Sequence, residues 1–555
     1  MQEAQQFGLF TPVNTDRVDR EKKAAVTVII GNPPYNVGQK SENDNNKNRK
    51  YKVVDGRIRD TYAKDSKATN KNSLSDVYVK FFRWATDRLG DRDGIVCFVS
   101  NNSFVDQHAF DGMRKHLARD FNQIDHIDLH GNVRRNPKLS GTTHNVFGIQ
   151  VGVGITMAIK KRGLKPRLRY FRVPEMWRKR EKLDFLSEGR IAWQSLTPDD
   201  RHSWIVLENA DEYSQFVPLS DIFSLYTVGV KTNRDDVVYD WNREKLAVRM
   251  ESFIAAYNAE VYRHKADPDG DWPDNLKWSR DLKQDALRGR LAEFADSKIL
   301  QSSYRPFAKK WLFFDRVLNE EIYQWPKISG RVIWVKVGSA WPFFVLLSDV
   351  ICDLLPQGGS QCFPFAYLRD SALTNFREYY RDNSITKHDI FHYIYAILHH
   401  PVYRERYAEN LKRELPRIPF APDFGAFATA GKELARLHLG YESLEPWHLE
   451  YIERKDVPFS ERVTKMKLSK DRTAIQVNES LTLAGIPTEA FNYKLGSKSA
   501  IEWIIDQYQV KGDSDPNRED DPGYIVRLVG QVVRVSIETV RLVNSLPSFL
   551  VEAIM

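Results

Sequence analysis

Residues 28–39, VIIGNPPYNVGQ, decide how the first part of the chain folds. The β-branched residues that open this stretch favour a strand, and two prolines follow them. Because Pro33 and Pro34 have no amide hydrogen, neither can donate a ladder hydrogen bond, and the strand must end at Asn32. Tyr35 then lies beyond the carboxyl end of a strand, which is where open α/β sheets bind their ligands.

The segments that follow alternate between strand and helix patterns up to about residue 160. This rhythm predicts an α/β fold with a mostly parallel, doubly wound, Rossmann-like sheet. Residues 37–72 are rich in Asn, Lys and Asp without apolar periodicity, so we expect a long loop or lid there. The expected elements are strands at 26–31, 94–99, 123–131 and 144–161 and helices at 74–89 and 109–121.

After residue 182 the pattern changes to short, aromatic-rich strands interrupted by helices, of which 243–266 is the longest. A helical part is expected from about residue 386, and residues 524–536 read as a strand near the end of the chain. These patterns predict an α+β second domain with a helical C-terminal part. The expected division is a first domain at 1–165, a basic linker at 166–220 and a second domain at 221–555.

Composition and charge narrow the class of protein. The 555 residues exceed what one hydrophobic core holds, so two to four domains are expected. The net charge of +8 fits a polyanionic partner. Residues 160–182 carry eleven basic residues against two acids, and they form either a solvated surface strand and helix or a strip that contacts phosphates.

The same composition argues against several other classes. No apolar run reaches the roughly 18 residues of a membrane span, and the N-terminus lacks the pattern of a secretory signal. The three cysteines are too far apart for a disulfide framework or a zinc ribbon. We therefore expect a cytoplasmic protein with no membrane partner.

Residues 32–35 suit chemistry at a planar exocyclic amine, whose lone pair is delocalised into its ring. The side-chain carbonyl of Asn32 and the backbone carbonyl of Pro33, held outward by Pro34, can accept hydrogen bonds from the two amine protons. Tyr35 offers a flat face on which an extruded base can stack. The alternative is a Pro-Pro turn that only ends a strand.

The sequence GNPPY resembles the catalytic motif of amino-group methyltransferases that use S-adenosylmethionine, especially the N6-adenine DNA methyltransferases. The wider resemblance is to the C-terminal half of Type ISP restriction–modification enzymes. In that family one polypeptide joins a nuclease, a helicase-like motor, an adenine methyltransferase and a target-recognition domain. The stretches that carry this resemblance are 12–39, 74–89, 94–106, 140–161 and 385–420.

The resemblance implies S-adenosylmethionine as cofactor, double-stranded DNA as partner, and a set of site residues. For Phe147 the alternative is packing inside a strand, and for Asn101, Asn102 and Ser103 it is a plain strand-to-helix turn. The implied residues are Asn32, Pro33, Pro34 and Tyr35 for catalysis, Phe147, Asn101, Asn102 and Ser103 for the base pocket, and Asp76 and Tyr78 near the cofactor or the base.

One part of the family pattern is missing. The family places a glycine-rich cofactor motif of FxGxG type upstream of NPPY, whereas the 31 residues before Asn32 contain none. The VGVG at 151–154 is no substitute, because it lies inside an apolar stretch with no helix start after it. We therefore expect a fragment, a split subunit or a truncated product, with the N-terminal nuclease, helicase and methyltransferase portion as a candidate partner chain.

The second domain offers candidates for reading DNA. The segments VGVKTNRDD and YRPFAKKWLFFD combine cations, Asn and aromatics, which are side chains that contact base edges or remain ordinary surface residues. The histidines at 388, 392 and 399 share one helix stripe without an HExxH motif, so packing or DNA-backbone contact is expected instead of a metal site. The DNA-binding candidates are Lys231, Asn233, Arg234, Arg305, Lys309 and Lys310.

Three hypotheses follow. The first is sequence-specific methylation of adenine N6 by base flipping, as part of DNA restriction–modification. The alternative is a catalytically incomplete DNA-binding specificity fragment of a larger restriction–modification enzyme. The third is a protein-glutamine methyltransferase, against which the large basic and aromatic C-terminal region argues, since a glutamine-containing loop needs no such reader.

Overall fold

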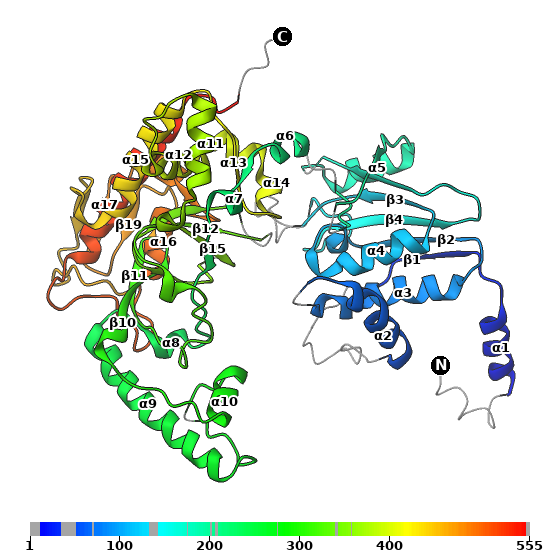
Figure 1. Ribbon diagram of the computed structural model, residues 1–555, viewed down its shortest axis with the longest axis horizontal. Coiled ribbons are helices and arrows are strands. Elements are labelled where there is room, and N and C mark those ends of the chain that lie inside the picture. The colour runs from blue at the N-terminus through cyan, green and yellow to red at the C-terminus, as the bar shows by residue number, and fades with distance from the viewer. Residues whose placement is uncertain are drawn as a thin grey trace. The chain divides into compact units, whose positions relative to one another are not determined.

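The structure is a computed structural model, and it consists of two compact units, Met1–Val206 and Leu207–Met555 (Figure 1). Tyr35 of the predicted catalytic motif lies outside the described residues. The residues that the structure describes are 12–34, 51–68, 71–132, 143–174, 176–199, 202–205, 209–274, 276–338, 342–356 and 358–550.

The first unit contains a six-stranded sheet of order β1-β2-β4-β3-β5-β6. The pairs β1–β2 and β3–β5 are parallel, whereas β4 runs antiparallel between β2 and β3 and β6 runs antiparallel to β5. Four strands therefore point one way and two the other, which confirms the α/β prediction with a reversed strand inside the sheet. The strands are β1 Val28–Gly31, β2 Gly94–Asn101, β3 Gln123–Asp128, β4 Val153–Lys160, β5 Arg167–Arg172 and β6 Gln194–Ser195.

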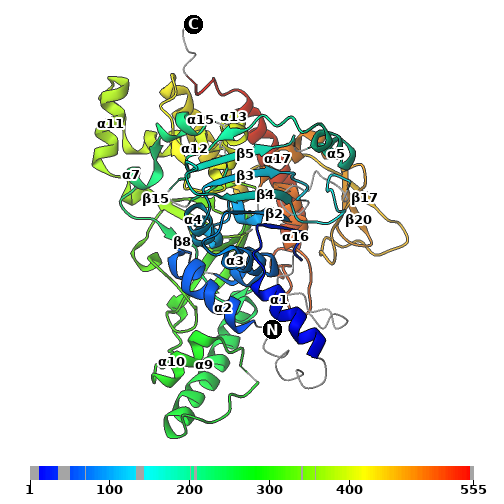
Figure 2. The ribbon, with the colours of Figure 1, turned by 90° about the vertical axis from the view of Figure 1, so that its right-hand side faces the viewer.

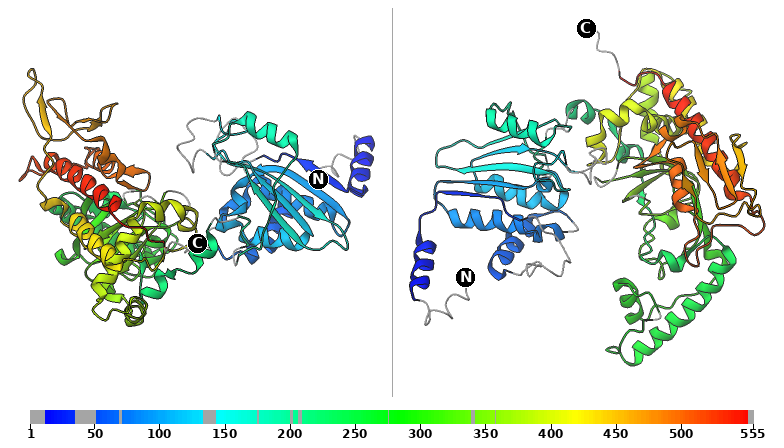
Figure 3. Two further views of the ribbon diagram at one scale, coloured as in Figure 1. Left: turned by 90° about the horizontal axis from the view of Figure 1, so that it is seen from above. Right: turned by 180° about the vertical axis from the view of Figure 1, so that it is seen from behind.

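Helices cover both faces of this sheet (Figure 3). One face packs on α2, α3 and α4, where Phe82 meets Phe98 edge-on at 5.1 Å. The other face packs on α5, where Phe185 stacks on Phe171 of β5 at 5.0 Å. The helices of this unit are α1 Pro12–Lys23, α2 Lys52–Ile58, α3 Val77–Leu89, α4 Asp111–Asp120 and α5 Lys179–Glu188.

Three expectations for this unit were wrong. Part of the expected loop at 37–72 is helical, because α2 and the π-helix after it bury Ile58 and Tyr62 in the core. The strand expected at 144–161 begins only at Val153, after a turn. The expected basic linker at 166–220 contributes β5, α5 and β6 to the first unit, because its cations alternate with inward-facing apolar residues.

The second unit combines several small sheets with helices. Its four-stranded sheets have the orders β14-β10-β11-β9, β13-β12-β15-β8 and β17-β20-β19-β18, and β16-β7 and β21-β22 are two-stranded. The strands are β7 Val217–Pro218, β8 Thr227–Val228, β9 Tyr239–Asp240, β10 Ile299–Arg305, β11 Ala308–Phe313, β12 Val332–Lys336, β13 Val345–Ser348, β14 Ile351–Cys352, β15 Ser360–Pro364, β16 Arg417–Ile418, β17 Glu450–Glu453, β18 Lys467–Leu468, β19 Ala474–Gln476, β20 Leu481–Ala484, β21 Lys494–Leu495 and β22 Lys498–Ser499.

The helices of the second unit show where the sequence patterns succeed. The predicted helix at 243–266 is confirmed as α9, and the helix expected from residue 386 is confirmed as α12, which Thr386 caps through Asp389. The helices are α6 Ala210–Ser214, α7 Leu219–Ile222, α8 Asp235–Val238, α9 Arg243–Ala266, α10 Arg280–Leu287, α11 Asp370–Tyr380, α12 Lys387–His399, α13 Pro401–Arg406, α14 Ala408–Leu411, α15 Phe424–Leu439, α16 Ala500–Gln507 and α17 Tyr524–Asn544.

Close packing of helices forms the core of this unit. A Cβ at Gly431 of α15 would lie 1.9 Å from the carbonyl oxygen of His392 in α12, so only glycine allows the two helices to approach this closely. Helix α15 packs on both α12 and α17 (Figure 2). The strand expected at 524–536 was wrong, because these residues form α17, which is buried around most of its circumference. In the described part of the chain, no helix combines the length and apolar character of a membrane span.

Strand β1 lies at an edge of its sheet, and within the described residues it pairs with β2 alone. Ile29 packs on the core under α3, whereas Val28 and Ile30 on the opposite face are 53% and 77% exposed. Exposed apolar residues on an edge strand favour association with further strands and binding of apolar dyes.

Substitutions at two neighbouring residues of β1 test this description. We expect Ile29→Ala to lower the free energy of unfolding by about 2 kcal/mol, because it leaves a cavity in the core. Ile30→Ala is expected to change it by less than about 0.5 kcal/mol and to reduce the fluorescence of a bound apolar dye. Thermal unfolding and dye fluorescence of the full chain measure both, and equal destabilisation by the two variants would contradict the assignment of faces.

Candidate functional site

The strand directions bring the predicted site residues of the first unit to one end of its sheet. Because β1, β2, β3 and β5 run in the same direction, all four end there, and β4 begins there. Asn32 follows β1, residues 101–103 end and follow β2, and Phe147 lies in the turn before β4. We call this region the carboxyl end of the sheet.

Residues 32–34 leave the sheet, as the two prolines predict. Gly31 is the last paired residue of β1, opposite Phe98. Asn32 and Pro34 are exposed, whereas Pro33 is buried between them and anchors the turn. The side chain of Asn32 is therefore presented at the surface by a buried neighbour.

The polar residues after β2 divide into two roles. The side-chain oxygen of Asn101 accepts a hydrogen bond from the backbone N–H of Ser103 at 2.9 Å, which caps the following turn. This contact fits the plain strand-to-helix turn. Asn102 is held differently, because its backbone N–H donates to the carbonyl of Gly152 at 2.9 Å and its side chain contacts a buried histidine.

That histidine, His126 of β3, is fully buried. Its Nε2 lies 2.7 Å from Oδ1 of Asn102, and its Nδ1 lies 2.9 Å from the hydroxyl of Thr156. Burial lowers the pKa of His126 to about 4, so the ring is neutral at pH 7. Since an amide oxygen only accepts, Nε2 carries the proton and Nδ1 accepts from Thr156. Gly154 leaves room for this arrangement, because a Cβ there would meet Asn102 at 2.5 Å.

A second buried network lies beside the first. The carboxylate of Asp128 accepts from the backbone N–H of His130 and the hydroxyl of Tyr170, both at 2.8 Å, and from Nε of Arg172 at 3.1 Å. Burial alone would raise the pKa of Asp128, but the charges of His130 and Arg172 hold it well below its usual range. Sequence reasoning missed His126 and Asp128, although polar residues within the apolar strand QIDHID were an available signal.

Phe147 is presented to solvent. It lies in a turn and its side chain is 48% exposed, so the alternative of packing inside a strand was wrong. Its role in stacking on a base stays a prediction.

The two residues predicted near the cofactor are buried. Asp76 is 3% exposed at the start of α3. Tyr78 is fully buried beside Phe104 and Phe110, with ring centres 6.2 and 6.1 Å away, and burial raises its pKa well above the usual value. Neither side chain is open to a ligand, so these described residues do not fit a cradle for S-adenosylmethionine.

The basic strip at 160–182 contains cations of two kinds. Arg169 forms a bidentate pair with Asp125, with both distances 2.7 Å, Arg172 pairs with Asp128, and Lys182 is fully buried. These three stabilise the fold. The exposed cations, which remain available to phosphates, are Lys161, Arg162, Lys165, Arg167, Arg178, Lys179 and Arg180.

The second unit contains a cavity of about 900 Å³. Three of the predicted DNA-binding residues line it, namely Lys231, Asn233 and Lys310. Both signs of charge occur on its wall. The lining carboxylates are Asp235, Asp236, Asp240, Asp353 and Asp513, and the lining cations are Lys231, Arg249, Lys277, Lys310 and Lys511.

Lys310 is held by aromatic rings. Its amino group lies 4.3 Å from the centre of the Tyr304 ring and 4.6 Å from that of Trp241. Burial and the nearby charge of Arg305 lower the pKa of Lys310 to about 8. Lys231 pairs with Glu320 at 2.9 Å, and the Asn233 amide donates to the same carboxylate.

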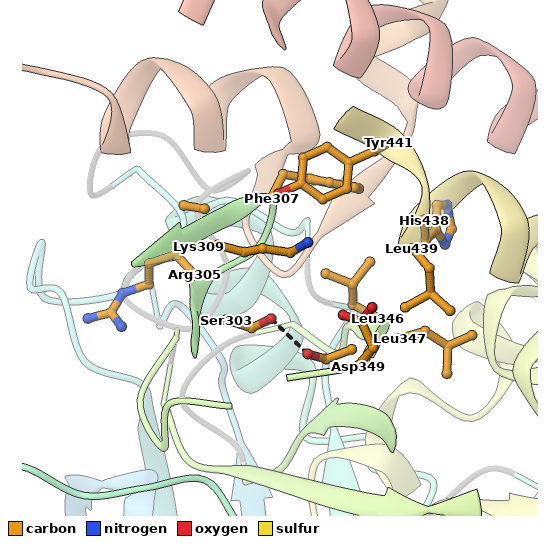
Figure 4. Close-up of a pocket in the computed structure, with 12 residues that line it drawn as sticks. Ser303, Arg305, Phe307, Lys309, Leu346, Leu347, Asp349, His438, Leu439 and Tyr441 are labelled. Carbon is orange, nitrogen blue, oxygen red and sulfur yellow. Dashed lines mark hydrogen bonds between the residues drawn. The ribbon is translucent and has the colours of Figure 1, made fainter. Parts of the chain in front are cut away.

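The other three predicted DNA contacts are engaged within the unit. Arg234 is 1% exposed and donates to Leu318 and to the hydroxyl of Ser279, so its side chain lies inside the unit and not on its surface. Arg305 pairs with Asp353 at 2.9 Å. Lys309 leaves the opposite side of the β10–β11 hairpin (Figure 4) and pairs with Glu442 at 3.0 Å. Burial raises the pKa of Asp353 to about 6.

Comparison with known proteins identifies both units. Residues 221–531 match the family described as the Type ISP C-terminal specificity domain, and residues 3–133 match the Eco57I restriction-modification methylase family. Three solved structures share the fold. DrdV in a complex with DNA is 36% identical with a TM-score of 0.78, and it is matched over 97% of this chain.

The other two structures are similar to the same degree. The Type ISP enzyme LlaBIII bound to DNA is 31% identical, and a nuclease-deletion mutant of the Type ISP enzyme LlaGI with a DNA substrate mimic is 33% identical, each with a TM-score of 0.78 over 97% and 98% of this chain. The chain spans 58%, 38% and 55% of DrdV, LlaBIII and LlaGI. No curated protein matches it.

The buried state of His126 predicts a pH dependence of stability. Because its pKa is about 4 in the folded chain and about 6.5 when unfolded, the unfolded chain takes up the proton first. The free energy of unfolding therefore has its full value above pH 6.5. It decreases by about 1.4 kcal/mol per pH unit as the pH falls toward 4. Hydrogen exchange of peptides from β3 and β4 measures the loss.

His126→Gln is the matched control, because glutamine retains a donor and an acceptor but does not titrate. We expect this variant to lose less protection in β3 and β4 on acidification than the parent chain does. Equal pH slopes in the two proteins would contradict the assignment.

Proposed function

Because the chain belongs to the Type ISP restriction–modification family, we propose that it methylates N6 of adenine within a specific DNA sequence in the cytoplasm. The exposed Asn32 beside the buried Pro33, at the carboxyl end of the sheet, is the observation that carries this proposal. The proposed substrate is double-stranded DNA from which one adenine is extruded into the site.

The proposed chemistry uses hydrogen-bond acceptors and no strong base. The side-chain oxygen of Asn32 and the backbone carbonyl of Pro33 accept hydrogen bonds from the two protons of the adenine amine. These bonds draw the nitrogen toward sp³ geometry and make its lone pair available for methyl transfer. Tyr35 and Phe147 are proposed to stack on the two faces of the base.

The methyl donor in this proposal is S-adenosylmethionine, which supplies an electrophilic methyl group. The buried side chains of Asp76 and Tyr78 do not fit its cradle, so no step is assigned to them. Within the described residues, the exposed edge of β1 is a surface that a further strand would extend.

The second candidate function is a DNA-binding specificity module without catalytic power of its own. The closed position of Asp76 and Tyr78 is the observation that favours it. Sequence-selective binding of DNA without methyl incorporation would distinguish this function from the first.

DNA recognition is proposed to use the cavity of the second unit. Its mixed lining of cations and carboxylates supports contact with base edges, which present both donors and acceptors, over contact with phosphates, which only accept. Lys231, Asn233 and Lys310 are the proposed readers. Arg234 supports them from inside the unit, and Arg305 and Lys309 are not proposed as readers because neither lines this cavity.

Methyl transfer tests the catalytic proposal. We expect the chain to transfer labelled methyl groups from S-adenosylmethionine to adenine N6 in unmethylated DNA. Asn32→Ala removes one acceptor, and we expect it to lower the rate by about 100-fold, as for other single contacts to a reacting group. Asn122→Ala, at the opposite end of β3, is the control and keeps the rate of the parent. DNA binding without incorporation by the parent chain would select the second candidate.

DNA affinity as a function of pH tests the role of Lys310. Because the neutral amine is uncharged and a much weaker hydrogen-bond donor than the ammonium, we expect affinity to weaken as the pH rises through about 8, the pKa of Lys310. Lys310→Met should weaken binding about tenfold at pH 7 and remove this pH dependence. Lys298→Met, which breaks an ion pair with Asp315 at the start of β10, serves as control. A parent chain whose affinity stays constant from pH 7 to 9 would exclude the contact.

A further inference from the structure

The turn that carries Phe147 is held by a buried amide. Asn145 is 1% exposed, and its Nδ2 donates to the carbonyls of Gly131 at 3.1 Å and Val151 at 2.7 Å. Its Oδ1 accepts from the backbone N–H groups of Phe147 at 2.9 Å and Ile149 at 3.4 Å. One side chain therefore fixes the backbone on both sides of the exposed aromatic ring.

A buried ammonium holds the same turn from the other side. Lys182 of α5 is fully buried, and its Nζ donates to the carbonyls of Leu129 and His144, both at 2.6 Å. Leu129 directly follows β3, and His144 precedes Asn145 in the turn. Lys182 thus ties three segments together, namely α5, the end of β3 and the turn before β4.

Further contacts hold the turn against α5 and against the end of β3. The N–H of Lys179 donates to the carbonyl of Thr143 at 3.1 Å, and Nδ1 of His144 lies 3.3 Å from the carbonyl of Trp177. Gly131 has a φ of +83°, and a Cβ there would lie 2.8 Å from the carbonyl of His144. The turn and the end of β3 are therefore packed backbone against backbone.

The chemistry of these contacts points to a purpose beyond packing. Burying an ammonium has a cost of several kcal/mol before its hydrogen bonds are counted, and an apolar side chain on α5 would avoid it. Both contacts of Lys182 named above, and all four of Asn145, go to backbone groups, so they set the path of the chain. The ring they surround is nevertheless 48% exposed.

We propose that Asn145 and Lys182 are positioning residues that hold the Phe147 ring ready to stack on the extruded base. This inference rests on the proposed function. A ring that is fixed before the base arrives loses little freedom on binding, so more of its stacking energy stabilises the complex. Neither positioning residue touches the base, and each acts only through Phe147.

The test uses the full chain and a duplex that it selects from a randomised pool. Replacing each adenine of that duplex in turn by an abasic site locates the target, and the affinity ratio between the intact and the abasic duplex measures the contribution of the base. Phe147→Ala is expected to lower this ratio about tenfold, the effect of losing one stacked base. Lys182→Met and Asn145→Ala are expected to lower it about fivefold, since the ring remains but is less well placed.

A double-mutant cycle separates positioning from general destabilisation. In the Phe147→Ala background, Lys182→Met and Asn145→Ala should have no further effect on the ratio. Arg114→Met is the matched control, because Arg114 is also a fully buried cation of this unit that donates to carbonyls, those of Phe104, Gln107 and His202. It should lower the melting temperature without changing the ratio. Asn145→Asp, which keeps the acceptor and loses the donors, replaces any variant that fails to fold.

Each outcome decides a separate question. A ratio that Phe147→Ala leaves unchanged would overturn the stacking role in the proposed function, and the positioning role with it. A ratio that falls in Phe147→Ala but not in Lys182→Met or Asn145→Asp would overturn the positioning role alone. The same would follow if the effects of Lys182→Met and Phe147→Ala were additive.

Discussion

The absence of amide hydrogens in Pro33 and Pro34 is the constraint on which the candidate site depends. Without those donors β1 cannot continue its ladder with β2, so the chain leaves the sheet at the end where β2, β3 and β5 also finish. Asn32 is exposed there because the next residue, Pro33, is buried. The reversed strand β4 adds its preceding turn to the same end, which is how Phe147 comes to lie on that side.

Buried polar contacts keep this end of the sheet in one arrangement. Neutral His126 fixes the amide of Asn102, and the Asp128 carboxylate accepts from two side chains of β5 and from the backbone N–H of His130. Asn145 adds four hydrogen bonds to the backbone around Phe147. Such groups are costly when unsatisfied, so each network tolerates few alternative geometries. An enzyme that must present acceptors to a weakly nucleophilic amine benefits from this rigidity, because no freedom is lost at the moment of reaction.

Helices whose formation depends on neighbouring residues could be predicted from the sequence. The helices expected at 243–266 and from about residue 386 are confirmed as α9 and α12. In the structure the buried residues of α9 recur every three or four positions and Thr386 caps α12 through Asp389, both of which depend on near neighbours. The valine-rich 524–536 read as a strand because β-branched residues favour strands, yet burial around most of α17 outweighs that propensity. The strand and helix that one reading of the basic strip expected are present as β5 and α5. The pairing of Arg169 and Arg172 with carboxylates was not predictable, because it arises only when β3 pairs with β5.

Side-chain roles were harder to predict than elements, because they depend on which charges meet in space. Six cations and amides of the second unit looked alike as DNA contacts, but Arg234 is buried inside the unit, and Lys231, Arg305 and Lys309 pair with carboxylates distant in sequence. Lys310 differs because aromatic rings, which attract a cation without neutralising it, hold its ammonium beside a large polar cavity. An ammonium kept charged and partly desolvated has more to gain from a base-edge acceptor than one already paired. The exposed cations of the first unit are better suited to phosphates, since several lie close together along residues 161–167 and 178–180. Net charge therefore indicates the polyanion, whereas the pairing state of each cation separates base reading from backbone contact.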